Sequence, residues 1–337
     1  MQSIKLWKPV VLAGSMLTMT TFAHAQSNTV IFQNLKIVTG AGTVINSGFV
    51  VVSGDKITSL GEGNPPMDPS AKVIDAKGLT AYPGLIDAYC AAGVAAPAAQ
   101  PAPTFNQGGG NQRNGQQNRP AAPPPPMPAW RKATDGLIMT NEGLNSLRIY
   151  GFTAANVISR GPLTPGEDAI IALSGSDKPE LIKERSGVNV NFQTRAGAYP
   201  GTLMGAIAFV RQAFYDGIDS HNHPPAKPDA KLDALGLAGE GKIPTFISTG
   251  TLNDAKRAIR FGQEFKIPAV VVGGAGIEPI AKQFAPGGPP LILTGAWDTA
   301  EALFKAGAEF ALASGRIELD GDEVKSMIIK ARDFVGK

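Results

Sequence analysis

The sequence contains little histidine and almost no cysteine, the residue types that most often bind transition metals. Its 337 residues include three histidines and one cysteine, Cys90. A single cysteine excludes an intramolecular disulfide, so burial of a core must stabilise the fold. We interpret Cys90 as a buried small side chain, because a free cysteine usually packs as a small hydrophobe; a reactive thiol is the alternative.

An excess of charge of one sign is also lacking. Lys and Arg number 31 against 28 Asp and Glu, and two of the lysines, Lys5 and Lys8, lie in a segment that we expect to be removed. The mature chain is therefore close to neutral. A strongly basic face is the usual mark of a nucleic-acid-binding protein, so we predict no nucleic-acid partner.

Long apolar runs are missing apart from one at the N-terminus. There Lys5 and Lys8 precede the apolar run Val10 to Phe22, and Ala23-His24-Ala25 follows it. A cationic start, a short apolar core and a small-residue ending are typical of a secretory signal, and the run is too short to span a membrane. We predict a signal peptide at residues 1–25 and a periplasmic or secreted protein that is not held in a membrane after cleavage.

The remaining sequence predicts two regions. Residues 26–80 alternate short β-branched runs with Gly and Asp turns, which indicates a small β layer. In residues 81–337, apolar runs alternate with helical patterns, which indicates repeated βα units around a parallel sheet. The predicted strands are 152–159, 168–174, 188–193, 243–249, 268–274, 289–295 and 309–315; the predicted helices are 202–217, 251–265, 277–285 and 299–307. We expect Thr202, Thr251 and Thr299 to cap helices.

One insertion, residues 96–130, interrupts this pattern. It is dominated by Gln, Asn, Gly and Pro and includes the run Pro123 to Pro126. Such a composition cannot bury a core, so we predict a low-complexity, mobile loop that leaves the first barrel strand. A solvated insertion without function is one interpretation, and a lid or a tether for a partner is the other.

Several segments together resemble the amidohydrolase superfamily, and most closely its imidazolonepropionase-like secreted members. The segments are QNLKIVTGAGTVINSGFVVVSGDKITSLGEG, VIDAKGLTAYPGLIDA, GFTAANVISRGP, AYPGTLMGAIAFVRQAF and IPTFISTGTLNDAKRAIRFGQEFKIPAVVVGGAG. The resemblance implies an α/β fold, a TIM-like (β/α)8 metallo-dependent-hydrolase barrel with a small N-terminal β-sandwich-like layer. It also implies a divalent metal, usually zinc, and hydrolysis of non-peptide C–N bonds in small molecules.

The metal ligands that the resemblance implies are replaced in this sequence. The two histidines of the first barrel strand correspond to Tyr89 and Ala91, and the two later histidines correspond to Ser248 and Gly273. The final carboxylate corresponds to Gly315. Zinc hydrolases need imidazole and carboxylate ligands around an ion that keeps one open position. We therefore predict no bound metal and a weak or lost hydrolase activity, and we assign no catalytic residue.

Other polar residues are expected near the barrel mouth. We predict Asn156, Arg160, Arg195 and Tyr199 as candidates for binding a small-molecule ligand, since an arginine could hold a carboxylate. Asp87 is interpreted as a structural hydrogen-bond acceptor. His221 and His223 are followed by two prolines and predict a surface loop without a metal, because a lone pair lacks a third ligand. Further polar residues expected at the mouth are Ser159, Thr249 and Asp298.

Two functional hypotheses of different class follow. In one, the chain is a non-catalytic subunit or ligand-binding barrel that assembles with an intact homologous amidohydrolase. In the other, it is an enzyme with a rearranged site built on Cys90, Tyr89 or the pair His221 and His223. Compared with the family, the sequence after residue 315 is short. We therefore expect an exposed edge in the β layer, covered by a partner unless the reading frame is truncated.

Overall fold

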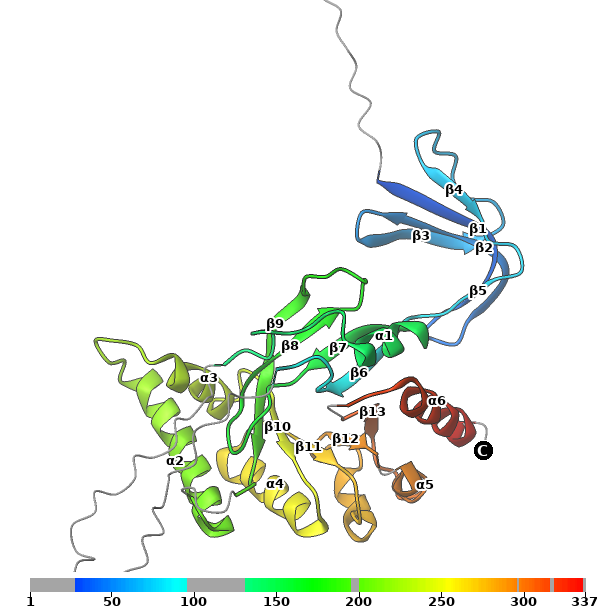
Figure 1. Cartoon of the computed structure of the whole chain (residues 1–337). Coiled ribbons are helices and arrows are strands. Elements are labelled where there is room, and N and C mark those ends of the chain that lie inside the picture. The colour runs from blue at the N-terminus through cyan, green and yellow to red at the C-terminus, as the bar shows by residue number, and fades with distance from the viewer. Residues whose placement is uncertain (1–27, 96–130, 195–199, 296, 316–317, 336–337) are drawn as a thin grey trace, which may run out of the picture. The chain divides into compact units, whose positions relative to one another are not determined.

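The computed structural model describes residues 28–95, 131–194, 200–295, 297–315 and 318–335. The chain divides into two compact units after Pro83 (Figure 1). The predicted signal peptide, residues 1–25, and the predicted low-complexity loop, residues 96–130, lie outside the described residues. No helix of the described chain has both the length and the apolar character needed to cross a membrane.

The N-terminal unit is one mixed β-sheet. Its order is β3-β2-β1-β4, and β5 also pairs with β1. The three N-terminal strands pair antiparallel, whereas β4 and β5 run parallel to β1. Small apolar clusters lie around Ile31 and Phe49 and around Leu35 and Ile37. This sheet agrees with the predicted β layer. The strands are β1 (Thr29–Val38), β2 (Val44–Ser53), β3 (Lys56–Glu62), β4 (Lys72–Asp75) and β5 (Thr80–Ala81).

The second unit is built on an eight-stranded sheet whose strands follow one another in sequence order. Its two edge strands meet, because the Gly315 amide after β13 donates to the Tyr89 carbonyl of β6 at 2.9 Å. The sheet therefore curls into a nearly closed barrel, and the predicted TIM-like α/β fold is confirmed. The strands are β6 (Leu85–Cys90), β7 (Phe152–Val157), β8 (Gly166–Ala172), β9 (Glu180–Asn191), β10 (Thr245–Ser248), β11 (Ala269–Gly273), β12 (Leu291–Thr294) and β13 (Phe310–Ala313).

One strand departs from the predicted parallel arrangement. β8 pairs antiparallel with both β7 and β9, whereas the other neighbouring strands pair in parallel. The connections explain the difference, because residues 158–165 and 173–179 are each shorter than the dozen or more residues that a parallel crossover requires. The expectation of a wholly parallel sheet was therefore wrong at β8.

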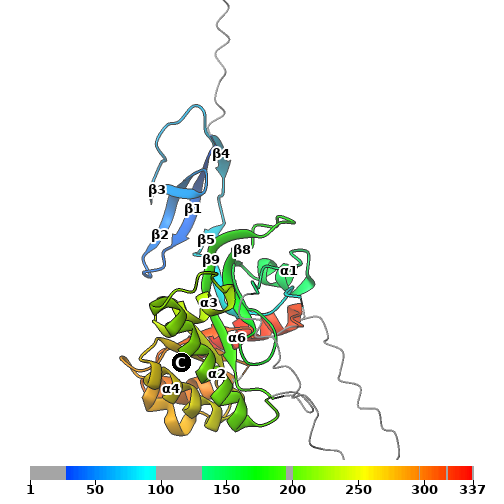
Figure 2. The same cartoon turned by 90° about the vertical axis from the view of Figure 1, so that its left-hand side faces the viewer.

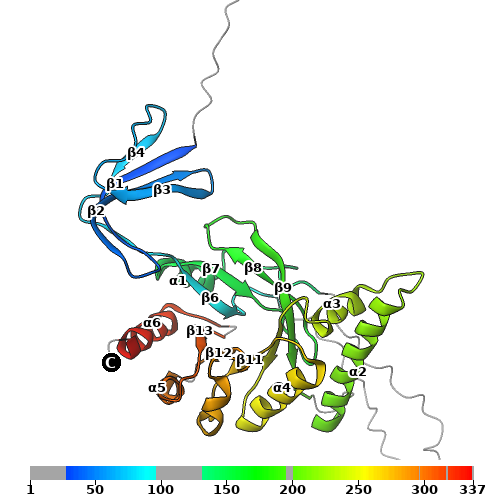
Figure 3. The ribbon, with the colours of Figure 1, turned by 180° about the vertical axis from the view of Figure 1, so that it is seen from behind.

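Helices cover the outside of the barrel between the later strands. Figure 3 shows α4 and α5 beside β11 and β12, and Figure 2 shows α2 and α3 next to each other. α1 and α6 also contact each other. The helices are α1 (Glu142–Ile149), α2 (Leu203–Asn222), α3 (Ala230–Gly239), α4 (Leu252–Phe265), α5 (Trp297–Lys305), α6 (Gly321–Val335) and the 3-10 helix η1 (Glu278–Phe284).

Two of the three predicted caps are present. The Thr202 hydroxyl accepts from the Gly205 amide at 3.1 Å, and the Thr251 hydroxyl accepts from the Asp254 amide at 3.2 Å. Each satisfies one of the amides that a helix start leaves unpaired. The Thr299 prediction was wrong, because α5 begins at Trp297 and the Thr299 hydroxyl instead donates to Glu278 at 2.8 Å.

The apolar core has an outer and an inner layer. The outer layer packs helices on the barrel wall, with Phe214 of α2 edge-on to Phe261 of α4 at a ring distance of 5.0 Å. The inner layer fills the barrel with Tyr89, Phe246 and Val272. Successive strand residues point to opposite faces, so each barrel strand contributes alternately to the two layers.

Candidate functional site

The centre of the candidate site is Tyr89, at the position of the first expected histidine ligand. Its ring lies in the inner core, 4% exposed, and tilted against Phe246 at a ring distance of 6.2 Å. Its hydroxyl donates to Asn189 Oδ1 of β9 at 3.0 Å and lies 2.6 Å from Ser248 Oγ of β10. Tyr89 therefore joins three strands by hydrogen bonds across the inside of the barrel.

These hydrogen bonds leave no space for a metal ion between the two hydroxyls. Two oxygens that bind one tetrahedral zinc ion at about 2.0 Å lie roughly 3.3 Å apart. The Tyr89 and Ser248 oxygens are closer than that and are bonded to each other. Burial, followed by the nearby charge of Asp168, raises the pKa of the Tyr89 hydroxyl. The hydroxyl is therefore held neutral, which does not suit a metal ligand or a general base.

Two other expected ligand positions are glycines that neighbouring atoms crowd closely. Gly273 has φ 143° and Gly315 has φ 64°, conformations that favour glycine. A Cβ atom on Gly273 would overlap the Thr249 carbonyl oxygen, and one on Gly315 would lie 2.6 Å from Thr294 Cβ. A histidine or carboxylate at either position would require a different local backbone.

The remaining expected position, Ala91, is also apolar and is 3% exposed. It belongs to the inner cluster with Ile158, Val272 and Ala313. Zinc needs nitrogen, sulfur or carboxylate ligands, and this cluster supplies none. In the described parts of the chain, no group of three His, Cys, Asp or Glu side chains is placed to hold a metal ion. The donor set at these positions therefore does not fit zinc.

Asp87 is a buried structural acceptor, as the sequence predicted. Its Oδ1 accepts from the amides of Tyr89 at 3.2 Å and Ser314 at 3.0 Å, and its Oδ2 accepts from the Ser314 hydroxyl at 2.5 Å. Burial raises the pKa of Asp87, although the hydrogen bonds from Ser314 and Tyr89 oppose this effect. The carboxyl thus ties β6 to the chain just after β13, where the barrel closes.

Polar side chains line the part of the barrel formed by β7, β8 and β9. Asn156 Nδ2 donates to the Ala88 carbonyl at 3.2 Å, and Asn156 Oδ1 accepts from Ser186 at 2.6 Å. Asn189 Nδ2 donates to the Ser159 carbonyl at 3.0 Å. These amides therefore connect neighbouring strands. Asn156, predicted to bind a ligand, is 5% exposed and already engaged in internal hydrogen bonds.

Asp168 of β8 has only part of its hydrogen-bonding capacity satisfied. It is fully buried, and its Oδ1 accepts from the Ser159 amide at 2.8 Å. Its Oδ2 has no hydrogen-bond partner among the described residues. Burial raises the pKa of Asp168 well above its ordinary value, only partly opposed by the Ser159 amide, and the charge of Glu167 raises it further.

Of the other predicted ligand-binding residues, the structure describes Arg160. Arg160 Nη1 donates to the Val94 carbonyl at 2.9 Å and so fixes the chain after β6. Arg195 and Tyr199 lie outside the described residues. Thr249 donates to the Val272 carbonyl at 2.9 Å, and Asp298 is an exposed partner of Lys330.

Cys90 is fully buried, and it lies on the outer face of the barrel wall. It packs with Leu144, Val157 and Val324 under α1 and α6. Burial, followed by the charge of Asp87, raises the pKa of the Cys90 thiol. Because the thiolate is the nucleophilic form, this thiol is poorly placed to act as a catalytic nucleophile.

The two histidines are placed differently from the predicted surface loop. His221 belongs to α2, and its ring nitrogens lie 3.1 Å from Glu240 and 3.3 Å from Asp233. His223 ends the helix and has an exposed side chain 2.9 Å from Asp219. The loop interpretation was therefore wrong for His221, because the helix continues through Asn222 and only then meets the prolines.

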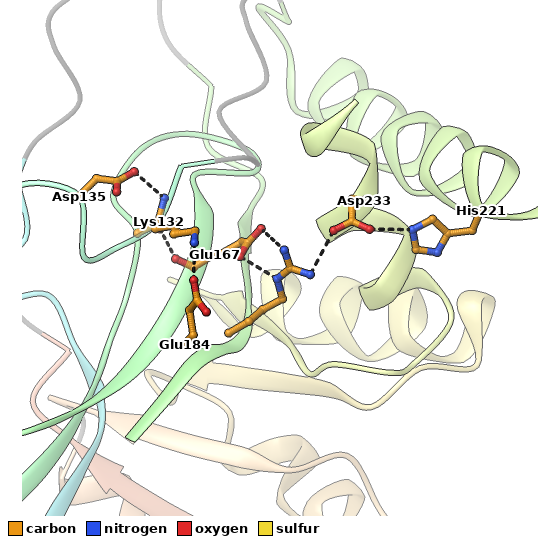
Figure 4. A network of polar contacts seen from close by, with 8 residues as sticks. Lys132, Asp135, Glu167, Glu184, His221 and Asp233 are labelled. Carbon is orange, nitrogen blue, oxygen red and sulfur yellow. Dashed lines mark hydrogen bonds and ion pairs between the residues drawn. The ribbon is translucent and has the colours of Figure 1, made fainter. Parts of the chain in front are cut away.

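The contacts of His221 extend into an ion-pair network that the sequence did not reveal (Figure 4). Asp233 also binds Arg185 at 3.1 Å, and Arg185 holds the buried carboxylate of Glu167 through two nitrogens at 2.7 and 3.0 Å. A separate ion pair, between Lys132 and Glu184 at 2.5 Å, lies beside Glu167 (Figure 4). This network ties the β8–β9 hairpin to α3 on the outside of the barrel.

Sequence reasoning also missed Asn189, which has a central position inside the barrel. A signal was present, because Asn189 and Asn191 alternate with Val188 and Val190 in an apolar strand. Such alternation places both amides on one face. By contrast, nothing local in the sequence indicates that Ser314 meets Asp87 across the barrel closure, since 227 residues separate them.

Solved structures with similar folds include an amidohydrolase and a prolidase. An amidohydrolase from Thermotoga maritima superposes with a TM-score of 0.69 at 20% identity, covering 90% of this chain and 83% of that one. A prolidase complexed with N-methylphosphonate-L-proline gives a TM-score of 0.50 at 14% identity, covering 88% and 79%. No family model matches the sequence, and no curated protein sequence matches it significantly. The chain therefore has the amidohydrolase fold.

Proposed function

We propose that this chain is an exported protein of the amidohydrolase superfamily in which the family's metal-dependent hydrolysis of C–N bonds is weak or lost. The observation that carries this proposal is the hydrogen bond between Tyr89 and Ser248, two expected ligand positions, across 2.6 Å. The crowded glycines Gly273 and Gly315 support it. Export is supported by the signal-like sequence of residues 1–25.

The test is the metal content of the purified mature protein after loading with zinc and dialysis. We expect far less than one zinc ion per chain by elemental mass spectrometry. We also expect no rise in melting temperature with added zinc, because only a ligand that binds the folded state stabilises it. Retained stoichiometric zinc, with turnover of a C–N substrate that chelation abolishes, would contradict the proposal. A prolyl dipeptide belongs in that substrate screen, given the prolidase-like fold.

A non-catalytic subunit of an intact homologous amidohydrolase is the second candidate. It is favoured by large apolar side chains on the N-terminal sheet, where Ile57, Leu60 and Val73 are 63%, 46% and 52% exposed. Ile57 and Leu60 lie on β3 and Val73 lies on β4, the two edge strands of this sheet, and an uncovered edge strand can pair with another chain. The partner would be a homologue with histidines at the positions of Tyr89 and Ala91.

The subunit hypothesis is tested by mixing the mature chain with that purified homologue and measuring the mass by light scattering after gel filtration. A stable hetero-oligomer that the double variant Leu60→Ser/Val73→Ser fails to form is the expected result. Separate elution of the two proteins at micromolar concentration would rule out this candidate. The enzyme with a rearranged site has less support, because Cys90 and Tyr89 are buried and their pKa values are raised.

A further inference from the structure

A groove with a volume of about 930 Å³ lies away from the barrel mouth. It runs along α4 and reaches Ala269 at the start of β11 and Pro290 just before β12. Both residues are at the amino-terminal ends of their strands. Ser248 and Gly273 are at the carboxyl ends of theirs, so the groove is at the opposite end of the barrel from the expected metal site.

The groove exists because the outer layer is thin at this point. The connection between β11 and β12 contains the seven-residue 3-10 helix η1, whereas the preceding connection contains the 14-residue α4. One flank of α4 is therefore left without a helix of similar length to cover it. The residues Lys256, Ile259 and Arg260 on this flank have the i, i+3 and i+4 spacing of one helix face.

The lining combines an apolar floor with a basic rim. Buried Ile259 and Ile267 form part of the floor. Lys256, Arg260 and Lys266 lie at the rim. None of the described residues that line the groove is acidic, and these three cations form no ion pair with another described residue. This contrasts with Arg257 on the same helix, which is paired with Asp254 at 2.8 Å.

We propose that this groove binds a small organic anion. Its apolar body would lie on Ile259 and Ile267, and Arg260 and Lys256 would hold its carboxylate, sulfonate or phosphate group. The volume is in the range of small-molecule sites, which are mostly apolar with a few polar groups that fix the ligand. A guanidinium holds such anionic groups through two parallel hydrogen bonds. The proposal does not depend on whether the barrel mouth retains activity.

The probe is 8-anilinonaphthalene-1-sulfonate, an aromatic sulfonate whose fluorescence rises on binding to apolar surface. The mature wild-type protein is titrated beside Arg260→Gln, Lys256→Gln and the matched control Arg257→Gln, which removes one positive charge from α4 outside the groove. We expect saturable binding that weakens about tenfold in Arg260→Gln, as for the loss of one charge-assisted hydrogen bond. Lys256→Gln should weaken binding less, and Arg257→Gln should leave it unchanged.

The neutral analogue N-phenyl-1-naphthylamine separates anion recognition from apolar adsorption. If the proposal is correct, the neutral probe binds more weakly than the sulfonate, and Arg260→Gln does not alter its affinity. Thermal melting by circular dichroism confirms that each variant is folded. Equal affinities of Arg260→Gln and Arg257→Gln for the sulfonate, or the absence of saturable binding to wild type, would overturn the proposal.

Discussion

The inside of the barrel has a mainly apolar half, in which Tyr89 and Ser248 contribute hydroxyl groups, and a polar half. β6 and β10 to β13 contribute Tyr89, Ala91, Phe246 and Val272, which pack as a core. β7 to β9 contribute Asn156, Asp168 and Asn189, which are buried and hydrogen-bonded. The apolar half contains all five expected ligand positions. The expected ligand positions therefore lie in the half that packs as a core, while the other half contains polar groups that join its strands.

The two halves are also stabilised differently. In the apolar half, the side chains are closely packed, so a larger side chain should destabilise the fold. In the polar half, the side chains of Asn156 and Asn189 depend on specific partners, and removing one partner leaves the other without a hydrogen bond. Substitutions in the two halves should therefore differ in the size of their effect and in its dependence on pH.

The largest effect is expected from Gly273→His, which introduces the histidine expected at this position from the resemblance. The side chain would overlap the Thr249 carbonyl at a φ of 143°, so we expect a loss of at least about 4 kcal/mol of unfolding free energy or failure to fold. Denaturant unfolding measures it. Gly307→His is the control, because Gly307 also has a positive φ, 76°, but has open space around it. An equal loss of unfolding free energy in the control would show that backbone strain, and not crowding by Thr249, destabilises Gly273→His.

Arg185→Ala should have the next largest effect. It leaves the Glu167 carboxylate, with a side chain 5% exposed, without its ionic partner. Breaking a fully buried pair costs about 3–5 kcal/mol; because the Arg185 side chain is 32% exposed, we expect a loss at or below the lower end of that range. Arg211→Ala removes the more exposed pair with Glu264 and should cost less than about 1 kcal/mol. Urea unfolding measures the free energy of unfolding of both variants. Equal losses would contradict the expectation that Arg185→Ala is the more destabilising of the two.

Tyr89→Phe tests the bond that crosses the boundary between the two halves. It removes the hydroxyl bonded to Asn189 and Ser248, and we expect a loss of about 1–3 kcal/mol for the unsatisfied partners. Ser248→Ala removes one of these partners. The double variant should therefore lose less than the sum of the single variants in a denaturant cycle. Strict additivity would show that the two hydroxyls do not interact.

Asp168→Asn should change the pH dependence of stability. Because burial raises the folded-state pKa of Asp168 above 3.8, the folded state binds the proton more tightly than the unfolded state does. Stability is then full below about pH 4 and falls as pH rises towards the folded pKa, by up to about 1.4 kcal/mol per pH unit. The variant should flatten this slope in unfolding measured from pH 4 to 8. Asp87 contributes a residual slope in the same direction, and an unchanged slope would show that Asp168 does not titrate differently on folding.

Much of the fold was predictable because it depends on local pattern. The apolar strands 245–248, 269–273 and 291–294 and the helices begun by Thr202 and Thr251 lie where the sequence placed them. α1, α3 and α6 were not predicted. The burial of Val324 and Met327 on α6 has helical spacing, so this helix could have been found by its periodicity.

The candidate site was predictable only in part. The expected ligand positions Tyr89, Ala91, Ser248, Gly273 and Gly315 could be singled out by resemblance, but their contacts in the barrel could not. Tyr89 and Asn189, which are hydrogen-bonded, are 100 residues apart in the sequence, and Asp87 and Ser314, also hydrogen-bonded, are 227 residues apart. No local pattern encodes such a pairing. His221 was misplaced because the prolines after it suggested an earlier helix end.

The sequence by itself determined the alternation of strands and helices, the helix caps at Thr202 and Thr251, and the lack of histidine and carboxylate side chains at the expected metal-ligand positions. These features follow from side-chain type and spacing, which act over a few residues. Only the tertiary structure decided that β8 runs antiparallel, that Tyr89 is hydrogen-bonded across the barrel and that a basic groove opens beside α4. Each depends on barrel closure and on the length of neighbouring connections, which bring distant residues together after the local elements have formed.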